Sequence, residues 1–179
     1  MVYVFLADGF EEIEALGTVD ILRRSELDVK TVSTTDSQEV CGAHGIKVLA
    51  DITTKDLDES DLEAIVLPGG LPGADNLENC KFVTDLCVKS AKEGKILAAI
   101  CAAPKVFGVL GLLDGVKATC YPGFEAKLFS AKLSRKRVVC DKNFITAKGA
   151  GITHEFAQAI ATALKKGSAA KRAINGMFY

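Results

Sequence analysis

The chain has 179 residues, with 22 basic and 23 acidic side chains and a formal net charge of −1. This length suits a single domain with a substantial core, and the balanced charge argues against a nucleic-acid partner. No apolar stretch approaches the ~20 residues of a membrane span, and no charged leader precedes the first predicted strand. We therefore expect a cytoplasmic protein that has no membrane partner.

Strand and helix patterns alternate from one end of the chain to the other. Short apolar runs predict strands at residues 2–7, 27–33, 63–67 and 95–100, a further short segment at 115–119, and a strand pair at 137–140 and 143–147. Other patterns predict helices at 11–24, 80–93, 102–111, 152–166 and 169–176, a hairpin-like region at 39–49 and a helical turn at 53–57. This alternation indicates an α/β fold over residues 1–179, a doubly wound and mostly parallel sheet with helices on both faces.

One cysteine lies where an apolar strand gives way to a helix. Cys101 follows the apolar run 95–100 and precedes Ala102, Ala103 and Pro104. At the beginning of a helix, free backbone N–H groups and the positive end of the dipole favour thiolate over thiol. Position alone leaves two interpretations of Cys101 open, a reactive thiolate or a small packing residue, because free cysteine is also among the most buried residue types.

Two further segments end at the same predicted edge of the sheet. Pro68, Gly69 and Gly70 follow the strand at 63–67, and glycine lets backbone amides turn toward a neighbouring site. Glu14 lies on the helix that follows the first strand, and the carboxyl ends of parallel strands converge on one crevice. At helical spacing Glu14 shares a face with Gly17 and Ile21, so a partly desolvated carboxyl with a raised pKa is expected. The alternative is an ordinary surface glutamate.

Cysteine and histidine spacing indicates no metal centre. The six cysteines form no C-x-x-C pair and no tight cluster with histidine; they lie at positions 41, 80, 87, 101, 120 and 140. Free thiols suit a reducing compartment, and most of them are expected to be packing residues. His154 is expected to be structural. His44, in a glycine-flanked loop, has a structural or supporting role or else reaches the pocket, and the sequence leaves both open.

Four motifs in order and spacing resemble the ThiJ/PfpI superfamily, most closely its DJ-one (Parkinson-disease protein) branch. They are Asp8 to Glu14 (DGFEEIE), Leu67 to Gly70 (LPGG), Ala98 to Pro104 (AAICAAP) and Lys148 to Gly151 (KGAG). The match covers nearly the whole chain. The resemblance implies a flavodoxin-like fold, a homodimer, Cys101 as the reactive cysteine and Glu14 as the carboxyl that contacts it. It also implies an oxyanion pocket from the amides of Gly69 or Gly70 and Ala102.

The chain departs from this family at one position. Many relatives place a histidine in a Thr-His-Pro-like context after the nucleophile helix, and here the stretch reads Thr119-Cys120-Tyr121-Pro122. Tyr121 either donates to a bound carbonyl or packs beside Pro122, and its phenol is a poor base near neutral pH. The substitution argues against a peptidase or amidase.

The resemblance implies a cofactor-independent enzyme. It would act as a glyoxalase on small dicarbonyls such as methylglyoxal, or as a deglycase on their adducts. Either activity would protect against carbonyl and oxidative stress. Neither a metal nor glutathione is expected to take part. The chief alternative is a redox-sensing or chaperone-like stress protein that uses an oxidisable Cys101. A non-catalytic binding module on the same sheet is a further alternative.

Overall fold

The computed structural model describes all of residues 1–179 and is built around one seven-stranded sheet. The strand order is β10-β11-β7-β6-β1-β2-β5, and every neighbouring pair is parallel except β10 and β11. These strands are β1 (Val2–Leu6), β2 (Val29–Ser33), β5 (Ile52–Thr53), β6 (Ala64–Leu67), β7 (Ile96–Ile100), β10 (Val138–Asp141) and β11 (Phe144–Ala147). Two small pairs lie outside this sheet: β3 (Glu39–Cys41) with β4 (Lys47–Leu49), and β8 (Lys117–Ala118) with β9 (Lys132–Leu133).

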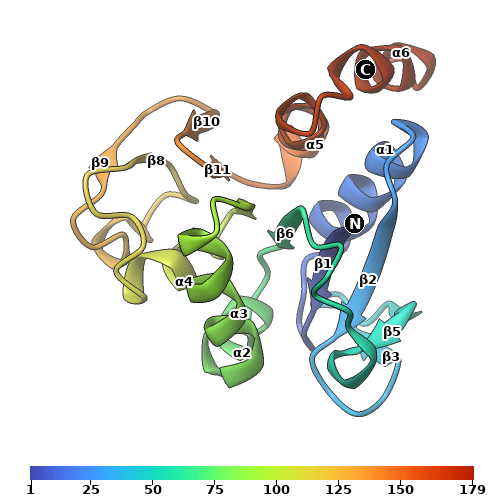
Figure 1. Ribbon diagram of the computed structural model, residues 1–179, viewed down its shortest axis with the longest axis horizontal. Coiled ribbons are helices and arrows are strands. Elements are labelled where there is room, and N and C mark those ends of the chain that lie inside the picture. Colours follow the sequence, from blue (N-terminus) through green and yellow to red (C-terminus); the bar gives the residue numbers. More distant parts are fainter.

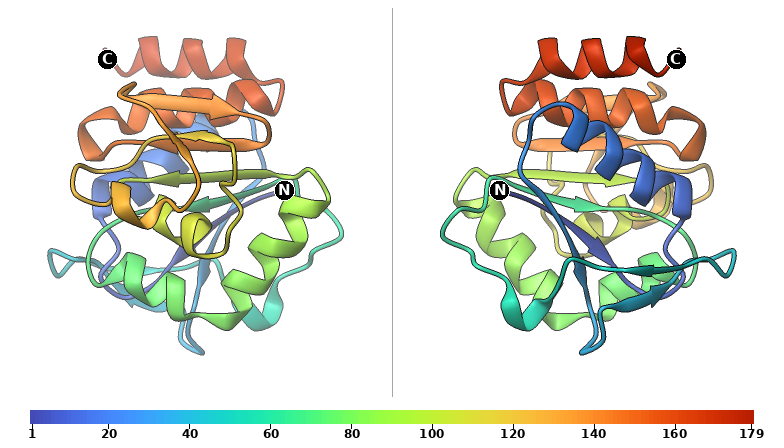
Figure 2. Two further views of the ribbon diagram at one scale, coloured as in Figure 1. Left: turned by 90° about the vertical axis from the view of Figure 1, so that its left-hand side faces the viewer. Right: turned by 90° about the vertical axis from the view of Figure 1, so that its right-hand side faces the viewer.

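Helices cover both faces of the sheet, as Figures 1 and 2 show. On one face lie α1 (Thr18–Arg24), α5 (Thr153–Ala163) and α6 (Gly167–Gly176), and on the other lie α2 (Gly73–Asn79), α3 (Lys81–Lys92) and α4 (Pro104–Val109). Alternate residues of β1 explain the two layers. Val2, Val4 and Leu6 belong to the core cluster under α1 and α5, whereas Tyr3 and Phe5 belong to the cluster under α3 and α4.

The sheet topology brings three loops to one edge. In the sheet β2 lies on one side of β1 and β6 lies on the other. The strand order therefore reverses between β1 and β6. Residue pairs such as Val4 with Val66, and Leu67 with Ala99, keep the carboxyl ends of β1, β6 and β7 level. Open α/β sheets bind ligands in the crevice outside such a point.

The predicted fold class is confirmed, and so are most predicted elements. Several local features differ from the predictions. The helix predicted from residue 11 begins as a π-helical turn, Ile13–Gly17, and α2 and β9 were not predicted. The helix expected at 102–111 is shorter, because residues 101–103 form a turn before Pro104.

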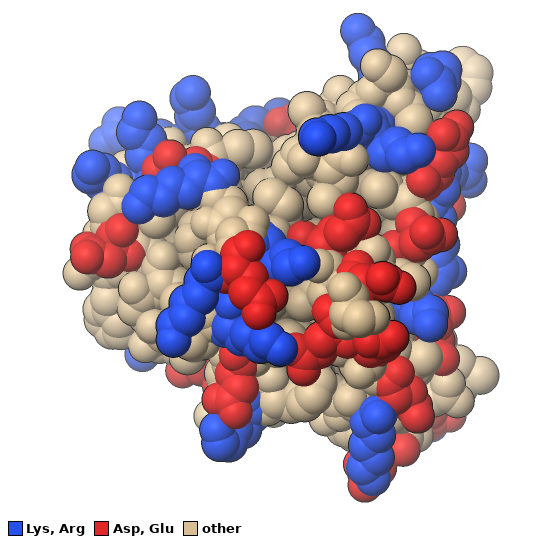
Figure 3. Space-filling model, viewed as in Figure 1, with Lys and Arg blue, Asp and Glu red and all other residues tan.

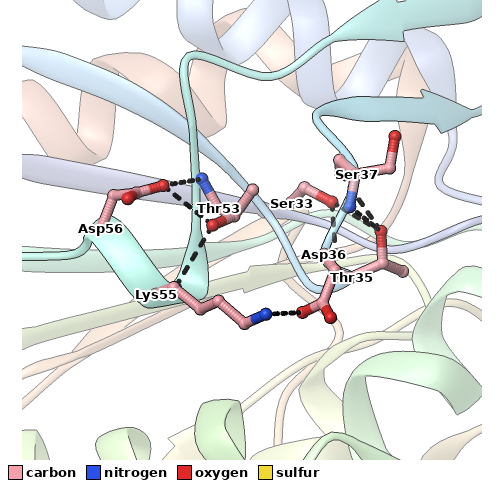
Figure 4. Close-up of polar contacts among 7 residues, drawn as sticks. All are labelled: Ser33, Thr35, Asp36, Ser37, Thr53, Lys55 and Asp56. Carbon is pink, nitrogen blue, oxygen red and sulfur yellow. Dashed lines mark hydrogen bonds and ion pairs between the residues drawn. The ribbon is translucent and has the colours of Figure 1, made fainter.

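Short polar networks close the loops at the β5 edge. Thr53 caps a 3₁₀ turn, Thr54–Asp56, and its backbone N–H and hydroxyl both donate to the Asp56 carboxylate, while Lys55 pairs with Asp36 in the loop after β2 at 2.8 Å (Figure 4). On the face seen in Figure 3, basic and acidic side chains are interspersed. No helix is both long enough and apolar enough to span a bilayer.

Candidate active site

Cys101 lies at a sharp turn between β7 and α4. Its φ is +63°, in the left-handed region that a residue with a Cβ adopts only at a cost of about 1–3 kcal/mol. Hydrogen bonds hold the turn on both sides, because the Cys101 amide donates to the Ala147 carbonyl at 2.9 Å and its carbonyl accepts from the Tyr121 amide at 2.8 Å. The side chain is half-buried. A strained strand-to-helix turn that presents a side chain at the edge of a sheet is a frequent setting for a nucleophile.

Glu14 is buried beside this turn. It lies on the π-helical turn Ile13–Gly17 and is only 1% exposed. Its Oε2 accepts a hydrogen bond from the Gly69 amide at 2.8 Å, whereas its Oε1 has no hydrogen-bond partner in the chain. Burial raises the pKa of Glu14 to about 7; the negative charge of Glu11 adds to this rise and the Gly69 amide opposes it. A carboxyl with this pKa exchanges its proton near neutral pH, as a general acid or base must.

The two glycines after β6 allow the site to be this close-packed. A Cβ on Gly69 would lie 2.7 Å from the Cys101 Cβ and 2.7 Å from the Glu14 Oε2, so no other residue fits without displacement. Gly70 has φ +89°, and a Cβ there would collide with the backbone of the turn after β1. The backbone amides of Gly70 and Ala102 act to lower the pKa of Cys101, as the donors of an oxyanion pocket would.

The surroundings of Cys101 oppose the thiolate that its position before a helix predicts, as long as Glu14 is ionised. Burial, together with the charge of the Glu14 carboxylate and its contact with the sulfur, raises the pKa of Cys101 to about 12, and the amides of Ala102 and Gly70 only reduce that rise. Protonation of Glu14 removes the repulsion and turns the same contact into an O–H donor to sulfur. A neutral Glu14 thus favours the thiolate and an ionised Glu14 opposes it, so the protonation states of the two groups are coupled.

Tyr121 lies beside the pair. Its ring approaches Gly149, where a Cβ would lie 3.3 Å from the Tyr121 Cδ2 and 4.0 Å from the Glu14 Oε1. Tyr121 is 50% exposed. The free Oε1 of Glu14 and the Tyr121 ring thus lie on the same side of the site.

His44 lies outside this cluster and pairs with Glu12. Its Nδ1 is 2.7 Å from the Glu12 Oε2, and its backbone amide donates to the Glu12 Oε1 at 2.7 Å. The hydrogen bond and charge of Glu12 raise the pKa of His44; His44 in turn lowers the pKa of Glu12 although burial opposes this. The side-chain atoms of Glu11, Glu12 and His44 that could bind a metal ion lie within 4.8 Å of one another. Both Glu12 oxygens, however, already take part in the pairing with His44.

Sequence reasoning missed a brace that joins the three loops of the site. Lys105, on α4, is buried and forms ion pairs with Asp75 and with Glu78 of α2, the latter at 2.8 Å. The first residues of α2 in turn bond to the other two loops, since the Ala74 amide donates to the Gly70 carbonyl and the Gly73 amide to the Gly9 carbonyl. Lys105 therefore ties the helix after Cys101 to the element that holds the glycine loop and the turn before Glu14.

These features define a doubly wound α/β protein with a cysteine and a buried carboxyl at the switch point of its sheet. The DJ-1/PfpI family model matches residues 1–163, and the chain belongs to this family. Over 157 residues it is 43% identical to Protein DJ-1 homolog B of Arabidopsis thaliana, covering 87% of this chain but only 36% of that protein. The chain thus spans about a third of the length of that relative.

Two further comparisons extend over most of both chains. The glutathione-independent glyoxalase DJR-1.2 of Caenorhabditis elegans is 32% identical over 157 residues, which are 87% of this chain and 83% of that protein. The solved structure of oxidized Toxoplasma gondii DJ-1 superposes with a TM-score of 0.94 at 32% identity, covering 99% of this chain and 97% of the other. The match to the Toxoplasma structure agrees with the predicted fold class.

Proposed function

We propose that the protein is a glutathione-independent glyoxalase that converts small dicarbonyls such as methylglyoxal to hydroxy acids, with Cys101 as nucleophile and Glu14 as proton carrier. The observation that carries this proposal is the buried Glu14 carboxyl, which has one oxygen on the Gly69 amide, the other free, and a pKa near 7. A relative named as such a glyoxalase supports the same reaction class. Protein adducts of dicarbonyls, which present the same carbon skeleton, are proposed as a second substrate group.

The reaction begins with addition of the Cys101 sulfur to the aldehyde carbon. The new S–C bond turns the carbonyl oxygen into an oxyanion that the amides of Gly70 and Ala102 stabilise, and the proton of Glu14 then neutralises it. The product of this step is a hemithioacetal, and Glu14 is left as a carboxylate.

Glu14 then moves a proton between adjacent carbons. Its carboxylate removes the proton from the carbon bonded to sulfur, which gives an enediol, and returns it to the neighbouring carbon. The result is a lactoyl thioester on Cys101. Water cleaves the S–C bond, releases lactate and restores the thiol, so the net change is methylglyoxal plus water to lactic acid. No step requires an external oxidant or reductant.

Lactate formation from methylglyoxal, measured without glutathione, tests the proposal. We expect wild-type protein to produce lactate and Cys101→Ser to lose at least about 100-fold in rate, since a hydroxyl is a far weaker nucleophile at neutral pH. Cys140→Ser, which changes an exposed cysteine on β10, is the matched control and keeps the wild-type rate. Equal rates for wild type and Cys101→Ser contradict the proposal.

A redox-sensing function is the second candidate. Cys101 is more accessible than the buried Cys87 and Cys120, and the structural relative from Toxoplasma gondii was solved in an oxidized form. Intact mass after mild peroxide tests this candidate: a gain of two oxygens on Cys101 before any other cysteine supports it, and oxidation of other cysteines first counts against it.

We also propose that the protein acts as a homodimer. Four apolar side chains are exposed on the π-helical turn and on the β3–β4 hairpin: Ile13, Leu16, Ile46 and Leu49. The His44–Glu12 contact joins these two elements, so their apolar side chains form one candidate interface. Light scattering tests the assembly state. Leu49→Glu, which places a charge on the most exposed of the four side chains, is expected to shift the mass toward the monomer.

A further inference from the structure

A second hollow lies away from the catalytic pair, beside β8 and β9, which Figure 1 shows side by side on the flank of the molecule opposite α1 and α6. Its volume is about 250 Å³, slightly below the ~300–1,000 Å³ of pockets for drug-sized ligands, so it suits a smaller molecule. None of the proposed catalytic residues lines it. The residues that do are Thr119, Cys120, Glu125, Leu133, Ser134, Arg135 and Lys148.

The lining carries two cations that have no partner in the chain. Arg135 and Lys148 form none of the fourteen ion pairs of the protein. Lys148 is half-buried, and its charge opposes the rise in the pKa of Cys120 that burial causes. A guanidinium and an ammonium on one small hollow provide the donors that a carboxylate prefers.

A threonine hydroxyl adds a neutral donor and acceptor to the same hollow. Thr119 is only 3% exposed, its backbone amide donates to the Thr146 hydroxyl at 2.9 Å, and its own hydroxyl makes no hydrogen bond within the chain. Because Thr119 lines the hollow, this unpaired hydroxyl is available to a ligand there. The Ser134 hydroxyl accepts from the Lys136 amide at 3.3 Å and still has its proton to donate.

The one acidic residue of the lining restricts the kind of anion. The Glu125 carboxylate, whose Oε2 accepts from the Gly123 amide, leaves the lining with a net charge of +1. It repels a doubly charged anion such as phosphate and accepts a hydrogen bond from a hydroxyl group of the ligand.

We propose that this hollow binds a small hydroxycarboxylate, with its carboxylate between Arg135 and Lys148 and its hydroxyl toward Glu125 and Thr119. The inference does not depend on the proposed reaction, although a hydroxy acid released by that reaction belongs to the same class. The position of the hollow links it to the catalytic pair through the chain. Cys120 and Lys148 directly precede Tyr121 and Gly149, which pack against each other beside Glu14.

Amide chemical-shift titration with sodium L-lactate tests the proposal, with sodium chloride at matched ionic strength as the reference. We expect saturable shifts at the lining residues with an affinity of about millimolar, because a ligand of six heavy atoms gains little binding energy. Arg135→Gln and Lys148→Gln each weaken binding about tenfold or more. Lys136→Gln, an exposed neighbouring cation that does not line the hollow, leaves it unchanged.

Two further ligands and one further variant distinguish binding in this hollow from binding at the catalytic pair and from a general effect of anions. Acetate, which lacks the hydroxyl, and inorganic phosphate are both expected to bind more weakly than lactate. The same shifts persist in Cys101→Ser, whether or not that variant retains glyoxalase activity. The proposal is overturned if the shifts do not saturate, if chloride reproduces them, if they centre on Cys101, or if Lys136→Gln weakens binding as much as Arg135→Gln does. Equal or tighter binding of phosphate also overturns it.

Discussion

Replacement of Glu14 by glutamine should change how stability depends on pH. The pKa of this carboxyl is about 7 in the folded protein, against an ordinary value of 4.5. A difference of 2.5 pKa units corresponds to about 3 kcal/mol of unfolding free energy. Because the folded state holds its proton more tightly than the unfolded state, this contribution is fully present below pH 4.5 and is lost as the pH rises to 7. Glutamine mimics the protonated acid and does not titrate.

Urea unfolding followed by circular dichroism, under reducing conditions between pH 4 and 8.5, measures the effect. The unfolding free energy of Glu14→Gln minus that of wild type should rise by about 3 kcal/mol across this range and level off above pH 7. Taking the difference cancels the titrating groups that do not interact with Glu14, and Glu93→Gln, at an exposed position, gives the size of an ordinary surface change. A difference that stays constant with pH refutes the raised pKa of Glu14.

Two packing features of the site give further predictions. Gly69→Ala should lower the glyoxalase rate more than tenfold and cost about 1–3 kcal/mol of stability, because its Cβ would collide with Cys101. Gly151→Ala is the control, because a Cβ there meets open space. It should leave the rate and the stability near wild type in the same lactate and urea assays. Lys105→Met should lower the unfolding free energy by about 1–3 kcal/mol in urea unfolding, because it leaves the carboxylates of Asp75 and Glu78 without their cation. It should also lower the alkylation rate of Cys101, because α4 would no longer be tied to α2. Lys89→Met, which removes an exposed ion pair, should cost under about 1 kcal/mol and leave alkylation unchanged, and equal effects of the two lysine variants would contradict the role of the brace.

Apolar runs and glycine positions made the sheet and most of its helices predictable from the sequence. Strands buried on both faces are continuous apolar segments, as in residues 64–67 and 96–100, and their order along the chain implies parallel pairing. The helix at 73–79 was missed because it is short and buries only Gly73, Ala74 and Leu77, which is too few for a clear helical period. The π-helical turn at Glu14 has no comparable signal in the sequence.

The chemistry of the site was less predictable than its location. The positions of Cys101 and Glu14 in the sequence placed both residues at the same edge of the sheet. The acidity of the thiol, however, was predicted only from the helix that follows the cysteine. The acidity of the thiol depends instead on burial and on a carboxylate 87 residues away along the chain, since Glu14 and Cys101 meet only through the tertiary fold. The Lys105–Asp75 pair was missed for the same reason, because its partners are 30 residues apart.

The pH dependence of iodoacetamide alkylation at Cys101, read by peptide mass spectrometry in wild type and Glu14→Gln, tests the coupling of thiol and carboxyl most directly. Removal of the carboxylate takes away its repulsion, so half-maximal alkylation in Glu14→Gln should occur roughly 1 to 3 pH units below that of wild type. Alkylation at Cys140 serves as the internal reference and should follow the same curve in both proteins. Coincident Cys101 curves would show that Glu14 does not control the thiol, and the proposed mechanism would lose its proton carrier.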